Sequence, residues 1–183
     1  MKKLCLPLFT ALCLLLSGCG SGSAKAAFEE LSNSVRERSR LSFTAGVRAE
    51  YEHKTARFTL SYEEDSDGGL VTVAAPELIA GVSARIEPGT TKLEYDSVVL
   101  DTGSLDNFGL SPLSSMPLLV QSIKAGHAES YRTEGDFTVI ELEPDDGLRC
   151  TVWFDDEMTP VRAELARDGQ VIIYMEINDW KVE

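Results

Sequence analysis

The amino-acid sequence predicts an α+β domain in which one curved antiparallel sheet of about eleven strands wraps over two or three helices. Through most of the chain, apolar and polar residues alternate with a period of two, and short turn signals separate the alternating segments. Two further segments have apolar residues at helical spacing. A sheet of so many strands with one apolar face cannot stay flat and open in water. We therefore expect it to curl around the apolar helices.

The beginning of the chain has the pattern of a secretory signal peptide. Lys2 and Lys3 precede an apolar run from Leu4 to Leu16, which is shorter than the roughly 20 residues that a membrane-spanning helix needs. We expect residues 1–18 to be removed, and the loss of both lysines changes the formal net charge from −13 to −15. Such acidity argues against binding to nucleic acid or adhesion to anionic lipid, because both attract basic surfaces.

The expected cleavage site, Leu16-Ser17-Gly18-Cys19, resembles the lipobox of bacterial lipoproteins. The resemblance implies that the Cys19 thiol is diacylglycerated, that cleavage follows Gly18, and that Cys19 becomes the first mature residue. The alternative is an ordinary signal peptide that happens to contain a cysteine. Two or more acyl chains would hold the domain at a membrane, at about 0.8 kcal/mol per buried CH₂ group. We therefore expect a lipid-anchored domain at the extracytoplasmic face of the cell membrane, or at the outer membrane in a Gram-negative cell.

The segment after the expected cleavage site divides into a tether and a helix. Gly20-Ser21-Gly22-Ser23 has the composition of a flexible linker, so residues 19–23 are predicted to form the lipidated anchor and its tether. The folded domain is then expected to span residues 24–183. A helix is predicted from about Ala24 to Arg40, because apolar residues recur along one side, namely Ala24, Phe28, Leu31 and Val35.

The first group of strands begins at Ser42. A turn near His53 divides the alternating segment into two strands that form a hairpin with one apolar face. That face carries four aromatic residues: Phe43, Tyr51, Phe58 and Tyr62. A third strand from Leu70 to Ala75 leads to a helical turn that begins with Pro76. Three more strands are predicted at residues 82–87, 91–95 and 98–101, separated by Pro88-Gly89 and Asp96-Ser97.

A second long helix is predicted from Ser111-Pro112 to the residue before Gly126, with a buried stripe of Leu113, Met116, Val120 and Ile123. Pro117 fits this helix only in its first turn, or if a short helical turn precedes the main helix. Asp168-Gly169, near the end of the chain, is its strongest hairpin signal. Five strands are expected to complete the domain, at residues 128–133, 137–143, 148–154, 161–166 and 171–178.

In this order of elements, the chain from Ala24 to Trp180 resembles the LolA/LolB-like family, the periplasmic lipoprotein carriers of Gram-negative bacteria and their relatives. The resemblance implies an unclosed antiparallel half-barrel that wraps over helices and leaves a hydrophobic cavity for acyl chains. Three local motifs agree with it: Val71-Thr72-Val73-Ala74-Ala75-Pro76, Gly89-Thr90-Thr91-Lys92-Leu93-Glu94-Tyr95, and the late hairpin between Phe154 and Leu165.

Two features distinguish the chain from the soluble carriers of that family. In those carriers an arginine precedes the proline of the first helical turn and latches a lid, whereas Ala75 occupies the matching position here. This chain also has a lipobox, as the lipidated outer-membrane receptors do. Lipidated relatives occur in spore-forming Gram-positive bacteria as well, where some are partners of cell-wall enzymes during germination.

Two functions follow from these expectations. In the first, the lipoprotein binds an apolar ligand, such as an acyl chain, a lipid or another lipoprotein, in the half-barrel cavity. The predicted lining comes from the aromatic hairpin and the second helix: Phe43, Tyr51, Phe58, Tyr62, Leu113, Met116 and Val120. The same residues could instead fill a packed core. In the second function, the domain is a lipid-tethered interaction protein that binds or regulates an envelope or cell-wall protein without a ligand.

The sequence predicts no catalytic constellation, metal site or cofactor-binding motif, so we do not expect an enzyme. His53 and His127 are the only histidines, and neither has nearby residues at the spacing of a triad or a metal site. The acidic turn at residues 63–68 resembles the start of a calcium loop. Ala74, however, occupies the position that should supply the bidentate glutamate, so we read this turn as solvated.

Cys150 is the one cysteine expected to remain unmodified, because Cys5 and Cys13 leave with the signal peptide and Cys19 is lipidated. The mature domain therefore has no internal disulfide. The Cys150 thiol is either reactive or buried as a small apolar group. Burial is favoured, because Cys150 shares one face of its predicted strand with Leu148, Val152 and Phe154.

Overall fold

The structure, a computed structural model, describes residues 20–87, 90–103, 110–145 and 147–183. Within these ranges it contains the helices α2 (Gly20–Glu37) and α3 (Pro112–Ala125) and the short 3₁₀ turn η1 (Glu77–Ile79). Eleven strands complete the described part of the chain: β1 (Leu41–Tyr51), β2 (Lys54–Asp65), β3 (Gly68–Ala75), β4 (Ser83–Glu87), β5 (Thr90–Tyr95), β6 (Val98–Gly103), β7 (Ala128–Glu134), β8 (Phe137–Asp145), β9 (Leu148–Phe154), β10 (Pro160–Arg167) and β11 (Gln170–Val182). The predicted fold class is confirmed.

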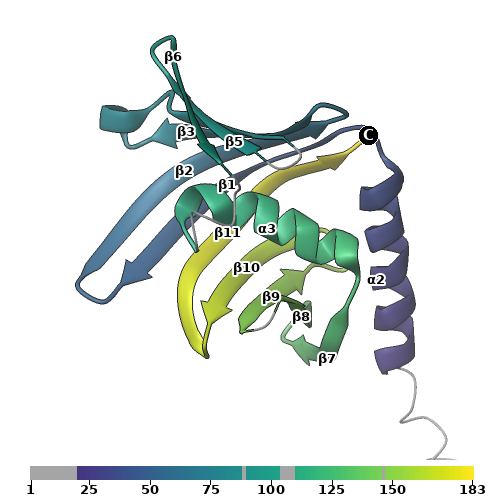
Figure 1. Cartoon of the computed structure of the whole chain (residues 1–183). Coiled ribbons are helices and arrows are strands. Elements are labelled where there is room, and N and C mark those ends of the chain that lie inside the picture. The colour runs from purple at the N-terminus through teal and green to yellow at the C-terminus, as the bar shows by residue number, and fades with distance from the viewer. Residues whose placement is uncertain (1–19, 88–89, 104–109, 146) are drawn as a thin grey trace, which may run out of the picture.

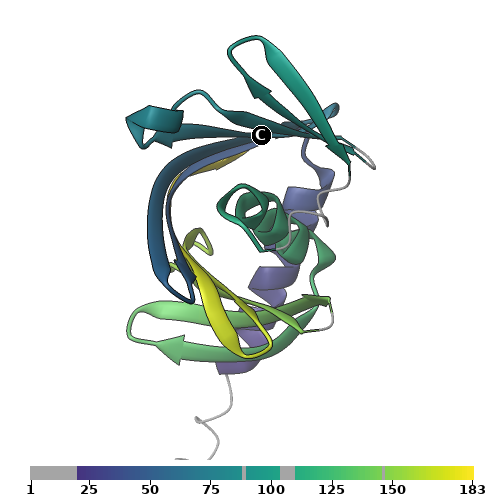
Figure 2. The same ribbon diagram turned by 60° about the vertical axis from the view of Figure 1, so that its left-hand side comes forward.

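The described strands form one sheet in the order β6-β5-β4-β3-β2-β1-β11-β10-β9-β8-β7, and each neighbouring pair is antiparallel. The central pair of β1 and β11 joins two meanders, one made of β1 to β6 and the other of β7 to β11. Strands β6 and β7 lie at opposite ends of this order, so the sheet is an unclosed half-barrel with two edges. Figures 1 and 2 show the sheet curling around α3, with α2 beside it.

The signal peptide, the lipobox and Cys19 lie outside the described residues, so their predictions stay predictions. Among the helices of the described ranges, none is long and apolar enough to cross a membrane.

Helix α2 begins at Gly20 and ends at Glu37. The segment Gly20-Ser21-Gly22-Ser23, predicted as a flexible tether, is therefore its first turn, and that prediction was wrong. The alanine-rich segment that follows is a strong helix former, and no proline intervenes to stop the helix from extending toward its N-terminal end. The helix ends before Arg40 because the N–H groups of Ser39 and Arg40 each donate to the Glu183 carbonyl oxygen at 3.1 Å.

Helix α3 is capped at both ends. The Ser111 hydroxyl accepts from the Ser114 N–H at 3.2 Å, and the Ser114 hydroxyl accepts from the Ser111 N–H at 2.9 Å. Gly126 ends the helix at φ 72°, a left-handed conformation that glycine adopts without strain. Pro117 lies inside this one continuous helix, beyond its first turn, so its predicted placement was wrong. Burial of its ring against the core offsets the backbone hydrogen bond that proline cannot donate.

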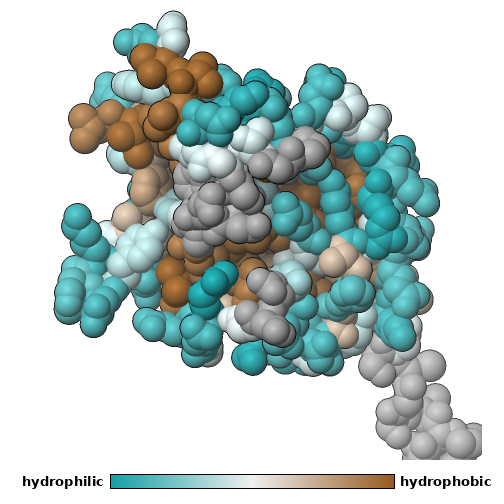
Figure 3. Space-filling view, in the orientation of Figure 1, coloured by the Kyte–Doolittle hydropathy of each residue, from teal (hydrophilic) through white to brown (hydrophobic). Residues whose placement is uncertain are grey.

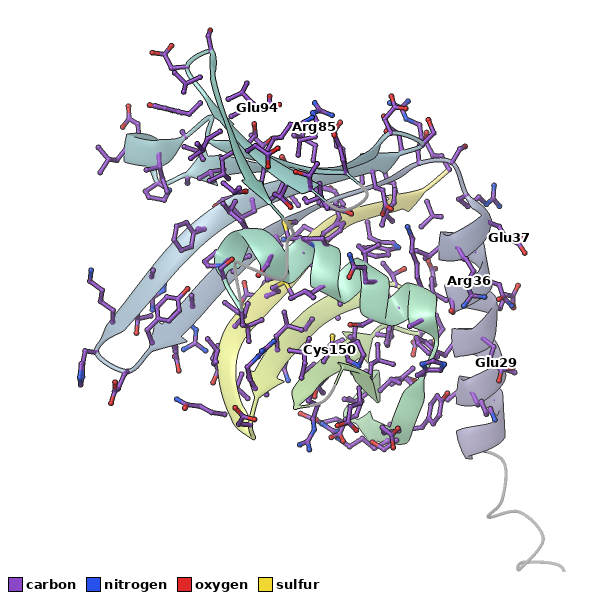
Figure 4. All side chains as sticks on the ribbon, in the orientation of Figure 1. Glu29, Arg36, Glu37, Arg85, Glu94 and Cys150 are labelled. Carbon is purple, nitrogen blue, oxygen red and sulfur yellow. The ribbon has the colours of Figure 1, made fainter. Side chains whose placement is uncertain are left out.

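Polar contacts fasten α2 to the C-terminal end of α3. The Lys124 carbonyl oxygen accepts from the Ser32 hydroxyl at 3.3 Å and from Arg36 Nε at 3.2 Å. Arg36 extends from α2 beside that end of α3 in Figure 4, where its positive charge complements the helix dipole. On the apolar side of α2, Phe28 is fully buried and packs against Phe154 with 6.0 Å between ring centroids. Helix α2 therefore belongs to the folded unit.

Candidate functional site

The concave face of the half-barrel is where the sequence predicts a ligand cavity. Four of the seven predicted lining residues, Phe43, Tyr62, Met116 and Val120, are at most 3% exposed and belong to one core cluster. The Phe43 ring packs between two others, at 5.4 Å from Tyr62 and 4.9 Å from Trp180 between centroids. The structure therefore brings these four residues together, but they contact one another and the rest of the core instead of open space.

The other three predicted lining residues keep exposed surface. Tyr51 ends β1 and is 44% exposed, because it lies at the tip of the β1–β2 hairpin. Phe58 faces the concave side, since it pairs with the buried Val47, and it is half-buried. Leu113 is half-buried in the first turn of α3. Phe58 and Leu113 are the predicted lining residues that pack against the core and still have surface for further contacts.

Helix α3 fills the concave side at the centre of the sheet. Its buried side chains include Met116, Leu119, Val120 and Ile123, each at most 1% exposed. A polar link fixes the same helix to β2, because Lys124 Nζ lies 2.6 Å from Glu64 and the Tyr62 hydroxyl donates to Glu64 at 3.2 Å. Burial raises the pKa of the Tyr62 hydroxyl above its usual value, and the nearby Glu64 carboxylate adds to this shift.

A pocket of about 720 Å³ lies on the opposite, convex face of the sheet around Gly46. Gly46 and Arg48 alternate along β1 with the buried Ala45 and Val47, so they point outward. The pocket also contains charges of both signs, including Arg57, Arg162, Glu164 and Glu176. The Arg48 guanidinium lies 3.9 Å from the centre of the Tyr174 ring. The missing side chain at Gly46 leaves open space there, and the lining combines these charges with apolar residues that include Val47, Phe58 and Met175.

The other side chains with reactive groups differ in their exposure. Cys150 is fully buried and free, as predicted. Burial raises the pKa of its thiol to about 12, and a hydrogen bond with Ser122 partly opposes that shift. His53 and His127 are both exposed, the first in the β1–β2 turn and the second after α3. Within the described residues, no group of three or more His, Cys, Asp or Glu side chains could hold a metal ion.

A set of exposed apolar side chains lies on the β5–β6 hairpin, at one edge of the sheet. We call Tyr95, Val98, Val99 and Leu100 the β6 edge patch, and they are 52%, 67%, 59% and 60% exposed. Leu78 in η1 is also strongly exposed, and Figure 3 shows hydrophobic side chains gathering over this region of the molecule. The sequence pattern predicts only an ordinary strand at residues 98–101. The sequence feature that could have indicated the patch is three consecutive apolar residues, Val98, Val99 and Leu100, in a strand that a short turn joins to its neighbour.

The class of fold is shared with solved structures of low sequence identity. A domain assigned to outer membrane lipoprotein sorting from Vibrio parahaemolyticus has 13% identity and a TM-score of 0.50, with 85% of this chain and 91% of that chain covered. An uncharacterized conserved protein from Thermus thermophilus has 11% identity and a TM-score of 0.51, with 88% of each chain covered. A DUF1329 family protein from Desulfovibrio piger has 11% identity and a TM-score of 0.50, with 87% and 92% covered.

At these identities the likeness shows the fold alone. The chain has the half-barrel fold of the lipoprotein-sorting domain, so the LolA/LolB-like fold expected from the element order is confirmed. No family model matches the chain, and no curated protein matches it in sequence.

Proposed function

We propose that the chain is a membrane-anchored, extracytoplasmic lipoprotein that acts as a protein-interaction module and not as an enzyme. The observation that supports this proposal best is the filled concave side of the half-barrel. At the centre of the apolar face, helix α3 packs Met116, Leu119, Val120 and Ile123, each at most 1% exposed, against the sheet. Because the chain's own helix satisfies this face, the domain needs no apolar ligand to complete its core. Its binding surface then lies on the outside of the scaffold.

The anchor in this proposal is the lipidated Cys19. Its support is the lipobox at the end of a short signal-like segment. A Cys19→Ala chain should lose both the lipid and the lipid-dependent cleavage. Metabolic labelling with a palmitate analogue measures this directly. Labelling that persists in the variant would contradict the anchor.

A second candidate function is the transport or storage of an apolar ligand. The fold shared with a lipoprotein-sorting domain and the half-buried Phe58 and Leu113 favour it. Burial of an acyl chain of about 16 carbons would gain on the order of 10 kcal/mol, which exceeds many estimates of the cost of association. Such a chain would have to displace part of α3 from the sheet, because the core residues beneath that helix are already in contact.

Titration with a fluorescent fatty acid separates the two functions. The interaction module should show no saturable binding. A carrier should bind saturably, and Phe58→Glu should abolish that binding while the variant stays folded, because water already reaches the half-buried Phe58 side chain. That pair of results would overturn the proposal in favour of the carrier.

A further inference from the structure

The two edge strands of the sheet, β7 and β6, differ in composition and in what covers them. Strand β7 carries Glu129, Arg132 and Glu134, and Arg132 Nη1 lies 2.8 Å from Glu141 on the neighbouring strand. Helix α2 also packs beside β7, where Phe28 and Tyr131 are 6.4 Å apart between ring centroids. Charges and a covering element are the usual protection of a sheet edge against pairing with another chain.

Among the residues that the structure describes, no strand pairs with the outer edge of β6, and the composition of this edge differs from that of β7. Val98, Val99 and Leu100 follow one another there, each more than half exposed. Val98 and Leu100 pair with Tyr95 and Leu93 on the concave face, where Leu93 adjoins the buried Ala84. Val99 pairs with Glu94 on the other face. A twelfth strand could therefore add to β6 and contact apolar side chains on both faces of the sheet.

The position of the β6 edge patch argues against a lipid bilayer as its occupant. Figure 1 shows the β5–β6 hairpin at one end of the molecule and the N-terminal end of α2 at the other. Helix α2 has 18 residues and is therefore about 27 Å long. A domain anchored next to Gly20, with α2 upright on the membrane, would hold this patch away from the membrane surface.

The charge around the hairpin indicates the chemistry of the occupant. Residues 77–103 contain Glu77, Glu87, Glu94, Asp96 and Asp101 against Arg85 and Lys92, a net charge of −3. Both basic side chains are already paired, because Arg85 lies 3.6 Å from Glu94 and Lys92 lies 2.8 Å from Glu87. Figure 4 shows Arg85 and Glu94 next to each other on the sheet. The field at the edge therefore attracts a basic segment and repels a second copy of this acidic chain.

We infer that the β6 edge patch docks an extended segment of a protein partner, in which apolar residues alternate and lysine or arginine flanks them. The segment adds to the sheet as a further strand beside β6. Its backbone pairs with the free edge, its apolar side chains cover Val98, Val99 and Leu100, and its basic flanks meet the carboxylates of the hairpin. This inference rests on the proposed function, because it names the surface and the partner class of the interaction module.

The test uses the full chain as cells produce it and a synthetic peptide of alternating valine and threonine residues flanked by lysines. The peptide should bind and should slow hydrogen exchange at the amides of β6. A peptide with glutamate flanks should bind at least about tenfold more weakly, and added salt should reduce that difference.

Two matched variants locate the site. Val99→Lys and Phe137→Lys each put a lysine at an exposed apolar position that pairs with a glutamate, Glu94 in the first case and Glu134 in the second. Neither change should unfold the protein, because both positions are exposed. Val99→Lys should weaken binding of the lysine-flanked peptide at least about tenfold, whereas Phe137→Lys should leave it unchanged.

Several results would overturn the inference. The first is that the lysine-flanked peptide does not bind. The second is that it slows hydrogen exchange at amides outside β6. The third is that Val99→Lys and Phe137→Lys weaken its binding equally. Dimerisation of the free chain that Val99→Lys abolishes would assign the edge to a second copy. Adsorption of the Cys19→Ala chain to phosphatidylglycerol vesicles, abolished by Val99→Lys, would assign it to lipid. Saturable fatty-acid binding, by contrast, would refute the proposed function, and it is measured without the peptide.

Discussion

The molecule carries two apolar surfaces, and they differ in what covers them. The concave face of the sheet lies under α3, where Leu119, Ile123 and Leu60 are fully buried. In the β6 edge patch, Tyr95, Val98 and Leu100 continue the same face outward, Val99 lies on the opposite face, and all four side chains are mostly exposed. Burial on the concave face stabilises the fold, whereas the exposed patch contributes little to stability. The interior therefore maintains the scaffold, and under the proposed function the exposed edge is the binding surface.

The largest expected difference in stability is between glutamate substitutions at two phenylalanines of the β1–β2 hairpin, Phe43 and Phe58. Phe43 is 2% exposed between Tyr62 and Trp180, so Phe43→Glu would bury an unpaired charge. Such a defect costs several kcal/mol, a large part of the roughly 5–15 kcal/mol that stabilises a domain, and the variant should unfold. Phe58→Glu should stay folded and melt within a few degrees of the wild-type protein. Circular dichroism during heating compares them, and similar melting of both variants would show that the two sites do not differ.

Substitution of alanine for a leucine in the core and for a leucine at the β6 edge tests the same difference in burial. Leu119→Ala removes a fully buried side chain and should lower the free energy of unfolding by about 2–5 kcal/mol. Leu100→Ala removes an exposed one and should change it by about 0.5 kcal/mol or less. Urea denaturation gives both values. A loss at Leu100 as large as the loss at Leu119 would mean that the β6 edge patch is part of the core.

A smaller, pH-dependent effect comes from Cys150, which lies under α3. The folded thiol keeps its proton up to a pKa of about 12, whereas an unfolded thiol ionises near pH 9. Stability from this group is therefore complete below about pH 9 and falls as the pH rises toward 12. At neutral pH a thiol reagent should modify Cys150 only as fast as the protein unfolds, and rapid labelling of the native chain would contradict its burial.

Much of the fold was predictable, because period-two alternation and turn residues are local signals. Asp168-Gly169, for example, is indeed the turn between β10 and β11. The start of α2 was missed because its glycine and serine residues suit a linker and a helix end equally well. Pro117 was misplaced because the burial that compensates a proline inside a helix depends on tertiary packing.

The candidate site was only partly predictable, for a reason that also concerns tertiary structure. Sequence alternation identifies which residues share a face, and it grouped Phe43 and Tyr62 with Met116 and Val120 correctly. It does not show whether space remains between them. It also cannot show that β6 is an edge, because three consecutive apolar residues equally fit a strand buried on both faces. The strand order determines that Val98, Val99 and Leu100 are exposed.

Native mass spectrometry of the processed chain, released gently from the membrane, tests the central claim most directly. The claim is that α3 fills the half-barrel and that the chain therefore carries no apolar ligand in its concave side. The expected spectrum shows the mass of the protein with its covalent lipid and nothing further bound. A stoichiometric second lipid that dissociates on mild activation, and that is missing from Phe58→Glu protein, would contradict the claim.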